Sequence, residues 1–435
     1  MLTTLRTALH RWDWIFLLCL VPLTTWYWLG IPSVPFHPDE ASNIYLSSDI
    51  ETFFSDPLSL SWNPLSQDHR QDLRLKDAPL GRYLIGLARW LTGSPALAVD
   101  WDWSQDWNSN AAAGALPASC LLNTSRWGGS ILFPFTLLLM YWTGLRLQGR
   151  LLAWLGALLL ATNPLFLLHS RRAMSEGSLL FCVVFFMACL ITCKQKTWLA
   201  AVPAALAFCA KHSAIPLAGV GMLLVWLRAG WPARWNRLLL LSAAYLGLFA
   251  AIAIAMYPII WKEPLKALQA AISARQELVT SQTQDFGQIA PEMILDSPWK
   301  AAFTMLVNLF ILPPSFSETG NYLEQIRESE VAYMLNPLHS LLRGIYIGGI
   351  LFTFCLFGCA WVVGQWFRPT AKHRLEWGLV GLAGASLFFA LSVTLKLPFQ
   401  RYVMPLLPFA SLYTAAGLYA AFSKFSQVIY ERRKL

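Results

Sequence analysis

Charged residues are scarce in this chain of 435 residues. Asp, Glu, Lys and Arg make up 13% of the sequence, whereas soluble globular domains usually carry about 25%. Hydrophobic residues make up 56%. They gather in repeated stretches of about 20 residues, enough to cross the roughly 30 Å hydrocarbon core of a bilayer as helices. The composition therefore excludes an ordinary soluble protein and predicts an all-α polytopic membrane protein.

The sequence also lacks the patterns of a disulfide framework and of a metal site. Seven of the eight cysteines lie in or at the ends of apolar stretches, and only Cys120 lies in a polar loop, so no loop disulfides are expected. His37, His69, His212 and His339 are scattered, without a cluster of His, Cys and Asp at ligand spacing. We therefore expect neither a metal nor another cofactor.

Ten membrane spans are predicted, within a single membrane domain at residues 1–435. The first span follows a short basic segment, but no small-residue cleavage site follows it, so we expect it to be retained rather than removed as a signal peptide. The predicted spans cover approximately residues 14–34, 128–145, 151–168, 177–193, 197–212, 213–227, 238–260, 340–364, 376–395 and 402–422.

The distribution of charge indicates the orientation of these spans. If the N-terminus is cytoplasmic, the short cytoplasmic segments hold basic residues such as Arg146, Arg150 and Arg368 and few acidic ones. The positive-inside rule then places both termini in the cytoplasm and the long loops 36–127 and 261–339 outside. The net charge of +9 therefore reflects membrane orientation, and no nucleic-acid partner is expected.

Three stretches in the long loops have helical apolar spacing but are too short to span. Residues 41–54 and 80–91 of the first loop predict helices that lie in the membrane interface. Residues 299–312 of the second loop predict an interfacial or re-entrant helix that ends at Pro313 and Pro314.

Two adjacent carboxylates, Asp39 and Glu40, follow the first span directly. Acidic side chains favour the first turn of a helix, so a capping role is one interpretation. The other is catalytic, because a carboxylate at this position is able to take a proton from a substrate hydroxyl.

Further charged groups lie at the outer ends of helices. Lys76 and Arg82 flank a helix N-terminus opened by Pro79, where backbone N–H groups and cations suit a phosphate, although lipid headgroups are an alternative partner. Ionisable groups at the membrane mark functional sites by default. Lys211, Arg401 and the neighbouring Tyr402 lie at such positions.

Arg171 and Glu176 lie five residues apart in a short outer connection. They are candidates for the binding site, and an alternative is a purely structural ion pair between them across the turn.

These segments together resemble the GT-C class of membrane glycosyltransferases, in particular the group of protein O-mannosyltransferases and lipid A aminoarabinose transferases (glycosyltransferase family 39). Asp39-Glu40 resembles the group's Asp-Glu motif, and residues 78–81 (Ala-Pro-Leu-Gly) are similar to its Pro-Pro-Leu-Gly segment. Residues 171–176 resemble its Arg and acid, and residues 401–405 (Arg-Tyr-Val-Met-Pro) its late Arg-Tyr-x-x-Pro. The resemblance covers residues 14–422, in the same order and on the same side.

The resemblance implies an inverting hexosyl- or pentosyltransferase. Its donor would be a sugar on polyprenyl or dolichyl phosphate, and its acceptor a hydroxyl of a lipid, glycan or protein outside a membrane, most simply the bacterial plasma membrane. Asp39 would be the general base, with Glu40 orienting the loop. Arg171, Lys211 and Arg401 would bind or support the phosphate.

Two other classes of protein place charges among membrane helices. Secondary transporters are usually built from repeats with broken helices at the midplane, whereas no internal repeat is apparent and the charges lie at outer helix ends. The second alternative is a lipid-binding membrane protein without catalysis. Only an enzyme would consume a lipid-phosphate sugar donor.

We predict that a cysteine introduced at Gln67 reacts with a membrane-impermeant thiol reagent from the extracytoplasmic side. Labelling in oriented vesicles measures this accessibility. Labelling from the cytoplasmic side alone would contradict both the orientation and the position of the site.

Overall fold

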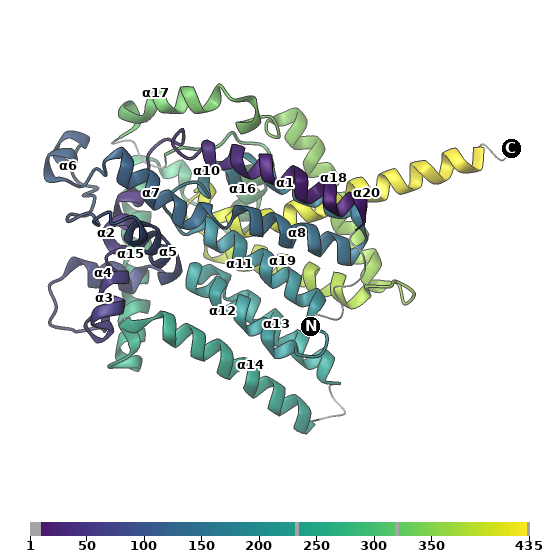
Figure 1. Ribbon diagram of the computed structural model, residues 1–435, viewed down its shortest axis with the longest axis horizontal. Coiled ribbons are helices and arrows are strands. Elements are labelled where there is room, and N and C mark those ends of the chain that lie inside the picture. The colour runs from purple at the N-terminus through teal and green to yellow at the C-terminus, as the bar shows by residue number, and fades with distance from the viewer. Residues whose placement is uncertain (1–9, 231–234, 318–321, 433–435) are drawn as a thin grey trace.

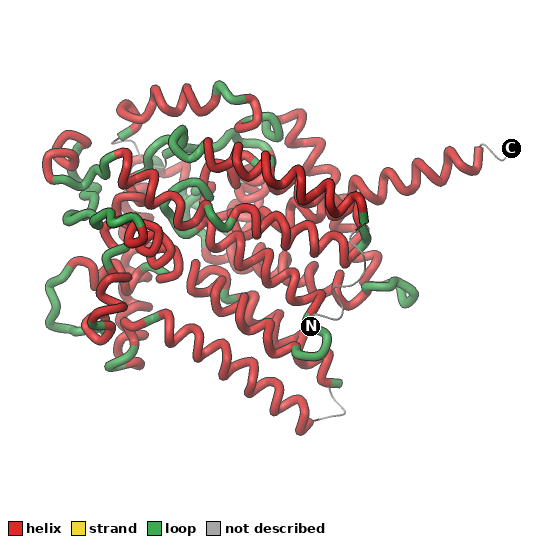
Figure 2. Tube along the Cα trace, in the orientation of Figure 1, coloured by secondary structure: helices red, strands yellow, loops and turns green. Residues whose placement is uncertain are grey.

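The computed structural model describes residues 10–230, 235–317 and 322–432. Within these ranges the chain forms helices and loops without strands, as Figure 2 shows. The long helices lie beside one another as a bundle in Figure 1. Helices α2 to α6 gather at one end of it, and the C-terminal part of α20 projects from the other end. The predicted all-α fold is therefore confirmed.

Each predicted span corresponds to a helix or a helix pair. Among the described residues, seven helical stretches are long and apolar enough to cross a bilayer, and three apolar helices are shorter. The number that cross stays a prediction. The helices are α1 (Arg11–Leu29), α7 (Ser119–Ser130), α8 (Phe133–Leu147), α9 (Arg150–Ala161), α11 (Glu176–Thr192), α12 (Ala201–Ala210), α13 (Pro216–Ala229), α14 (Trp235–Met256), α18 (Ile345–Phe367), α19 (Arg374–Thr394) and α20 (Leu407–Arg432).

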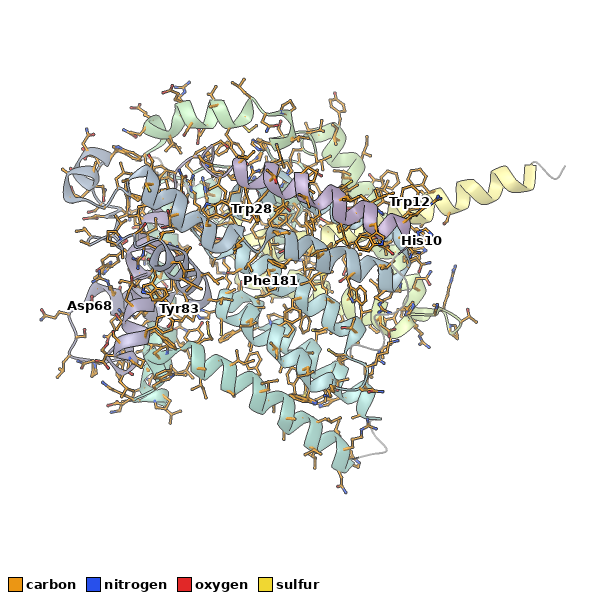
Figure 3. All side chains as sticks on the ribbon, viewed as in Figure 1. His10, Trp12, Trp28, Asp68, Tyr83 and Phe181 are labelled. Carbon is orange, nitrogen blue, oxygen red and sulfur yellow. The ribbon has the colours of Figure 1, made fainter. Side chains whose placement is uncertain are left out.

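Helices also cover the extracytoplasmic end, here defined by the side on which the predicted long loops lie. Tyr83 and Asp68 belong to this cap, whereas Phe181 lies inside the bundle (Figure 3). The cap consists of α2 (Pro38–Leu46), α3 (Asp49–Ser55), α4 (His69–Lys76), α5 (Pro79–Leu91), α6 (Trp107–Ala113), α15 (Pro264–Ile289), α16 (Pro298–Phe310) and α17 (Leu323–Met334). Short connecting turns are α10 (Pro164–His169), η2 (Pro57–Leu60), η3 (Thr197–Ala200), η4 (His212–Ala214), η5 (Pro258–Ile260), η6 (Pro291–Met293), η7 (Pro337–His339) and η8 (Gln400–Leu406).

The structure differs from the predicted helices in three places. The stretch 41–54 is two helices, because the chain turns at Ser47 and Ser48 between α2 and α3. Helix α7 begins at Ser119, nine residues before the predicted span at 128, because α7 packs against α5. The largest omission is α15, whose 26 residues are too polar to register as an apolar stretch.

Glycines allow the closest helix crossing in the bundle, between α18 and α20. A Cβ on Gly358 would overlap the carbonyl oxygen of Tyr413, and one on Gly417 would overlap that of Phe354. Small residues let membrane helices approach until their backbones touch. The close contact gives favourable dispersion energy, and bulkier residues would hold the helices apart. This crossing fixes α20 and therefore η8, the turn that precedes it.

We predict that Gly358→Leu lowers the stability of the fold, because overpacking at a backbone contact costs about 3 kcal/mol or more. Thermal unfolding in detergent, followed by size-exclusion chromatography, measures the effect. Gly349→Leu in the same helix is the matched control, because a Cβ there meets open space. Equal melting of the two variants would contradict the close crossing.

Candidate active site

The N-terminus of α2 presents the two adjacent carboxylates. Pro38 occupies the first helical position, and His37 is the N-cap: its Nδ1 accepts the N–H of Asp39 at 3.1 Å. Glu40 accepts the N–H of His37 at 3.1 Å and so completes a capping box. Burial and the nearby Arg172 and Arg401 lower the pKa of His37, which keeps the ring neutral and its Nδ1 able to accept.

Glu40 is fully buried and its carboxylate is saturated. Arg126 donates to both oxygens, from Nε and from Nη2, at 2.8 Å each, and the N–H of Ala173 donates at 2.8 Å. The remaining Arg126 nitrogen, Nη1, donates to the carbonyl of Ile31 at 3.0 Å. Glu40 therefore joins the first outer loop to α7 and to the turn before α11, and it does not face solvent.

Asp39 has a different environment, although it is the next residue. Its side chain is 25% exposed, and its carboxylate forms an ion pair with Arg401 of η8. The two residues are far apart in sequence, and they meet because η8 lies beneath the cap. Asp39 is thus the open member of the carboxylate pair.

Three more candidate residues extend this ion pair. The guanidinium of Arg401 lies 5.5 Å from the centre of the Tyr402 ring, and Lys211 Nζ lies 5.1 Å from the same centre. Lys211 Nζ is also 2.9 Å from Glu176 Oε1. Two cations therefore share one aromatic ring, and a carboxylate flanks the array at each end. We refer to Asp39, Arg401, Tyr402, Lys211 and Glu176 as the charged row.

The start of α5 lies beside one end of the charged row. Gly81 packs against the backbone of Ser175, next to Glu176, where a Cβ would lie 2.9 Å from Ser175 Cα. Asp77 is open to solvent, and the surrounding protein raises its pKa although Arg275 and Lys211 oppose the shift. The predicted segment at 76–82 is therefore next to Lys211.

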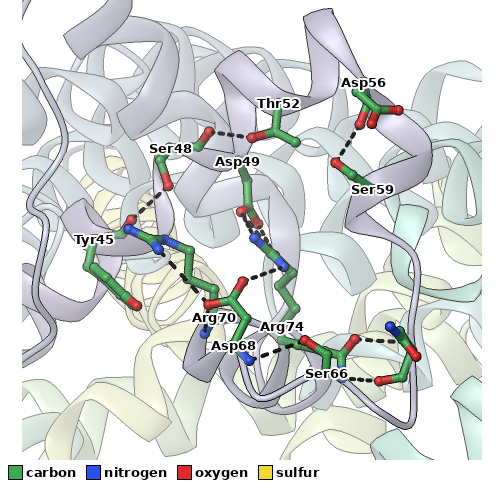
Figure 4. A network of polar contacts seen from close by, with 12 residues as sticks. Tyr45, Ser48, Asp49, Thr52, Asp56, Ser59, Ser66, Asp68, Arg70 and Arg74 are labelled. Carbon is green, nitrogen blue, oxygen red and sulfur yellow. Dashed lines mark hydrogen bonds and ion pairs between the residues drawn. The ribbon is translucent and has the colours of Figure 1, made fainter.

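Lys76 and Arg82 are already engaged by carboxylates. Lys76 Nζ lies 2.5 Å from Asp72 Oδ2, on the surface of α4. Arg82 is buried, with Nε 3.1 Å from Asp49 Oδ2, and Arg74 Nη2 lies 2.7 Å from Asp49 Oδ1. Figure 4 shows Asp49 and Arg74 at the centre of this network. Both arginines meet the Asp49 carboxylate, and Arg74 Nη1 also lies 3.6 Å from Asp68 Oδ2, so each of these cations has a carboxylate partner.

Arg171 lies in a separate buried pocket of hydrogen-bond partners and aromatic rings. Its Nε donates to the carbonyl of Tyr27 at 2.9 Å, and its Nη1 donates to His339 Nε2 at 3.2 Å. His339 Nδ1 in turn donates to the carbonyl of Tyr333 at 2.7 Å. Gly30 is required here, because a Cβ would lie 2.6 Å from the Arg171 guanidinium.

The ion pair between Arg171 and Glu176, weighed as an alternative from the sequence, is wrong. Glu176 is paired with Lys211 instead, because the turn after α10 directs Arg171 toward α1. Arg171 is fully buried, and its contacts are the carbonyl of Tyr27, His339 and aromatic rings rather than solvent.

Sequence reasoning missed Arg126, Arg275, Arg172 and Asp49. Arg126 carries a usable signal, since it is a cation at the entrance to a span, and ionisable groups there are expensive without a partner. Arg275 belongs to α15, which was not predicted. Arg172 donates to the carbonyls of Pro35 and Phe316, which no spacing rule indicates.

We predict that Arg126→Met costs about 3–5 kcal/mol of stability, because it leaves the buried charge of Glu40 without its partner. Chemical denaturation in detergent measures the loss. The double variant Glu40→Gln with Arg126→Met is the matched comparison and should recover part of it, since neither charge remains. A stable single variant would show that the pair does not hold the cap in place.

Comparisons with known proteins find one family match over part of the chain. A sequence model of the family "dolichyl-phosphate-mannose-protein mannosyltransferase" matches residues 69–261. That segment contains α4, α5, the Arg171 turn and Lys211, and it excludes Asp39 and Arg401. No curated protein sequence matches the chain significantly.

Two solved structures have a similar fold. One is the archaeal oligosaccharyltransferase AglB from Archaeoglobus fulgidus, in complex with an inhibitory peptide and a dolichol-phosphate. Its TM-score is 0.53, and the alignment has 13% sequence identity and covers 98% of this chain. The other is the oligosaccharyltransferase of Archaeoglobus fulgidus in complex with zinc and sulfate. Its TM-score is 0.51, and the alignment has 14% sequence identity and covers 93% of this chain. This chain spans about half of each, 52% and 49% of their lengths.

The second structure holds zinc, and the residues around Asp39 do not fit such a site. Asp39 and Glu40 are paired with arginines. Among the residues that the structure describes, no three His, Cys, Asp or Glu side chains converge at metal-binding distance. The family match covers less than half of the chain, and the two solved structures share its fold.

Proposed function

We propose that this chain is an inverting glycosyltransferase that moves a sugar from polyprenyl or dolichyl phosphate to an acceptor hydroxyl on the extracytoplasmic side. The observation that carries the proposal is the charged row, in which the open carboxylate of Asp39 meets Arg401, with Lys211 one ring further on. The family match at residues 69–261 and the dolichol-phosphate in the AglB complex support the class of donor.

The reaction needs a base and a cationic site for the leaving phosphate. The acceptor oxygen attacks C1 of the sugar as the bond from C1 to the phosphate oxygen breaks, and Asp39 takes the hydroxyl proton. The polyprenyl phosphate departs with the bonding electrons, and Arg401 and Lys211 stabilise its charge. One displacement inverts the anomeric centre.

The ion pair between Asp39 and Arg401 links binding to catalysis. A cation at hydrogen-bonding distance lowers the basicity of a carboxylate. When the donor phosphate attracts Arg401, the carboxylate of Asp39 shares its partner with a second anion and becomes a stronger base. The base is therefore strongest when the donor is bound.

The other candidate residues support the site indirectly, by holding the residues that would contact the substrates. Glu176 holds Lys211, and Tyr402 lies between the two cations. Arg171 fixes the turn before α11 from its buried pocket. Lys76 and Arg82 are each paired with a carboxylate and hold the helices beside the charged row.

The topology supports an extracytoplasmic location for the proposed reaction. The charged row lies at the end of the bundle where the cap helices gather (Figure 1). The excess of basic residues in the short connections at the opposite end supports an extracytoplasmic site. The bacterial plasma membrane is the simplest setting for a multi-pass chain of this kind.

We predict that Asp39→Asn lowers kcat for sugar transfer by about 10²- to 10⁴-fold, because its amide cannot accept the proton. Purified protein is supplied with radiolabelled polyprenyl-phosphate sugars and an acceptor extract, and donor consumption is measured. Donor KM should change little, since Arg401 and Lys211 remain.

Two further variants make the result decisive. Asp56→Asn removes an exposed carboxylate from the same loop and should transfer at the wild-type rate. Asp39→Glu keeps a carboxylate and should retain more activity than Asp39→Asn. Wild-type turnover in Asp39→Asn would exclude Asp39 as the base, and absence of donor consumption by the wild-type protein would contradict the proposed function.

A further inference from the structure

An aromatic cluster adjoins the N-cap of α2. The ring of Trp103 lies 6.3 Å from that of His37 and 6.2 Å from that of Tyr322, in edge-on arrangements. His37 accepts the N–H of Asp39. Trp103 therefore contacts, through His37, the helix turn that carries the Asp39 carboxylate.

A second group of rings includes Trp101, which lies two residues before Trp103 in the sequence. Phe36, Trp101 and Trp107 form a second triangle with ring centres 5.7–5.8 Å apart. Trp101 is 3% exposed and Phe36 is 9% exposed, whereas Trp103 is 42% exposed. Trp103 itself packs against the buried rings of His37 and Tyr322, so its position is fixed.

The chain on both sides of Trp103 is held by hydrogen bonds. The buried Asn110 accepts the N–H of Asp102 at 2.8 Å and donates to the carbonyl of Asp102 at 2.9 Å. The Asp102 carboxylate accepts the N–H and the hydroxyl of Ser104, at 2.8 and 2.7 Å. Preorganised groups lose little conformational entropy on binding, which is the property of a binding surface.

The position and charge of this segment limit the ligand. Helix α6, which begins four residues after Trp103, lies at the outer extremity of the cap in Figure 1, away from the bundle. Residues 90–125 contain no Lys or Arg and three acids, Asp100, Asp102 and Asp106. An anionic acceptor is therefore disfavoured, whereas hydroxyl groups find acceptors there.

We propose that Trp103 is a stacking platform for a neutral carbohydrate acceptor whose hydroxyl is presented to Asp39. The C–H groups on one face of a sugar ring are apolar and slightly positive, and they complement the negative face of an indole. The neighbouring carboxylates then accept hydrogen bonds from the sugar hydroxyls. This assignment rests on the proposed function, and it selects a glycan from the possible lipid, glycan and protein acceptors.

Binding without transfer tests the platform independently of catalysis. Purified full-length protein in detergent is titrated with a neutral hexose trisaccharide and, separately, with a Ser/Thr-rich peptide, and the tryptophan fluorescence is followed. A saturable response to the trisaccharide is expected in the wild-type protein and in Trp90→Ala, a control tryptophan that is 51% exposed on α5. It should be lost in Trp103→Ala and retained in Trp103→Phe.

Transfer kinetics give a second test of the Trp103 platform. Trp103→Ala should raise the acceptor KM by about 10-fold, which corresponds to the loss of one aromatic contact, while donor KM and kcat change little. Trp103→Phe should recover most of the difference. A role limited to folding would lower kcat and melting temperature in both variants and would overturn the proposal.

The outcomes separate the two proposals. Trisaccharide binding at Trp103 without transfer from any polyprenyl-phosphate donor would contradict the proposed function and leave the platform intact. Transfer with an unchanged acceptor KM in Trp103→Ala would overturn the platform alone. A fluorescence response to the peptide that requires Trp103, without one to the trisaccharide, would assign the surface to a protein acceptor and overturn the carbohydrate assignment.

Discussion

The buried ion pair between Glu40 and Arg126 is the interaction on which the site depends. Removing two charges from water costs several kcal/mol per ion, and the geometry must compensate with further hydrogen bonds. Here the N–H groups of His37 and Ala173 and the carbonyl of Ile31 complete the shell. The pair consequently fixes three segments, the first outer loop, α7 and the turn before α11, in one arrangement.

The helix geometry then gives the neighbouring carboxylate a different environment. Successive residues of an α-helix are turned by about 100° from one another. With Glu40 directed into the buried pair, Asp39 is directed toward η8 and solvent, where Arg401 meets it. One carboxylate is buried in an ion pair and the other is partly exposed because a single helix turn presents them to different sides.

The spans were predictable because apolar length is a local property of the sequence. The start of α5 was also predictable, from Pro79 at its first position. The pairing of charges was not, because it depends on distant segments: Glu176 selects Lys211 over Arg171, although Arg171 is closer in sequence. Helix α15 was missed because its alanines, glutamines and leucines favour a helix without forming an apolar stretch.

In the site, too, the residue types could be selected from the local sequence, whereas their partners depend on the tertiary fold. Asp39, Lys211, Arg401 and Tyr402 were all selected from the sequence as ionisable or aromatic groups at helix ends, and the structure brings them together. That Arg171 is enclosed by Tyr27 and His339 follows only from the tertiary fold.

The stereochemistry of transfer tests the central claim most directly. In a single displacement with Asp39 as base, the acceptor attacks from the face opposite the phosphate. The product formed from a donor of known anomeric configuration can be analysed by NMR. The account predicts the opposite anomer in the product, and retention of the donor's configuration would contradict it, because a single attack from the face opposite the phosphate inverts the anomeric centre.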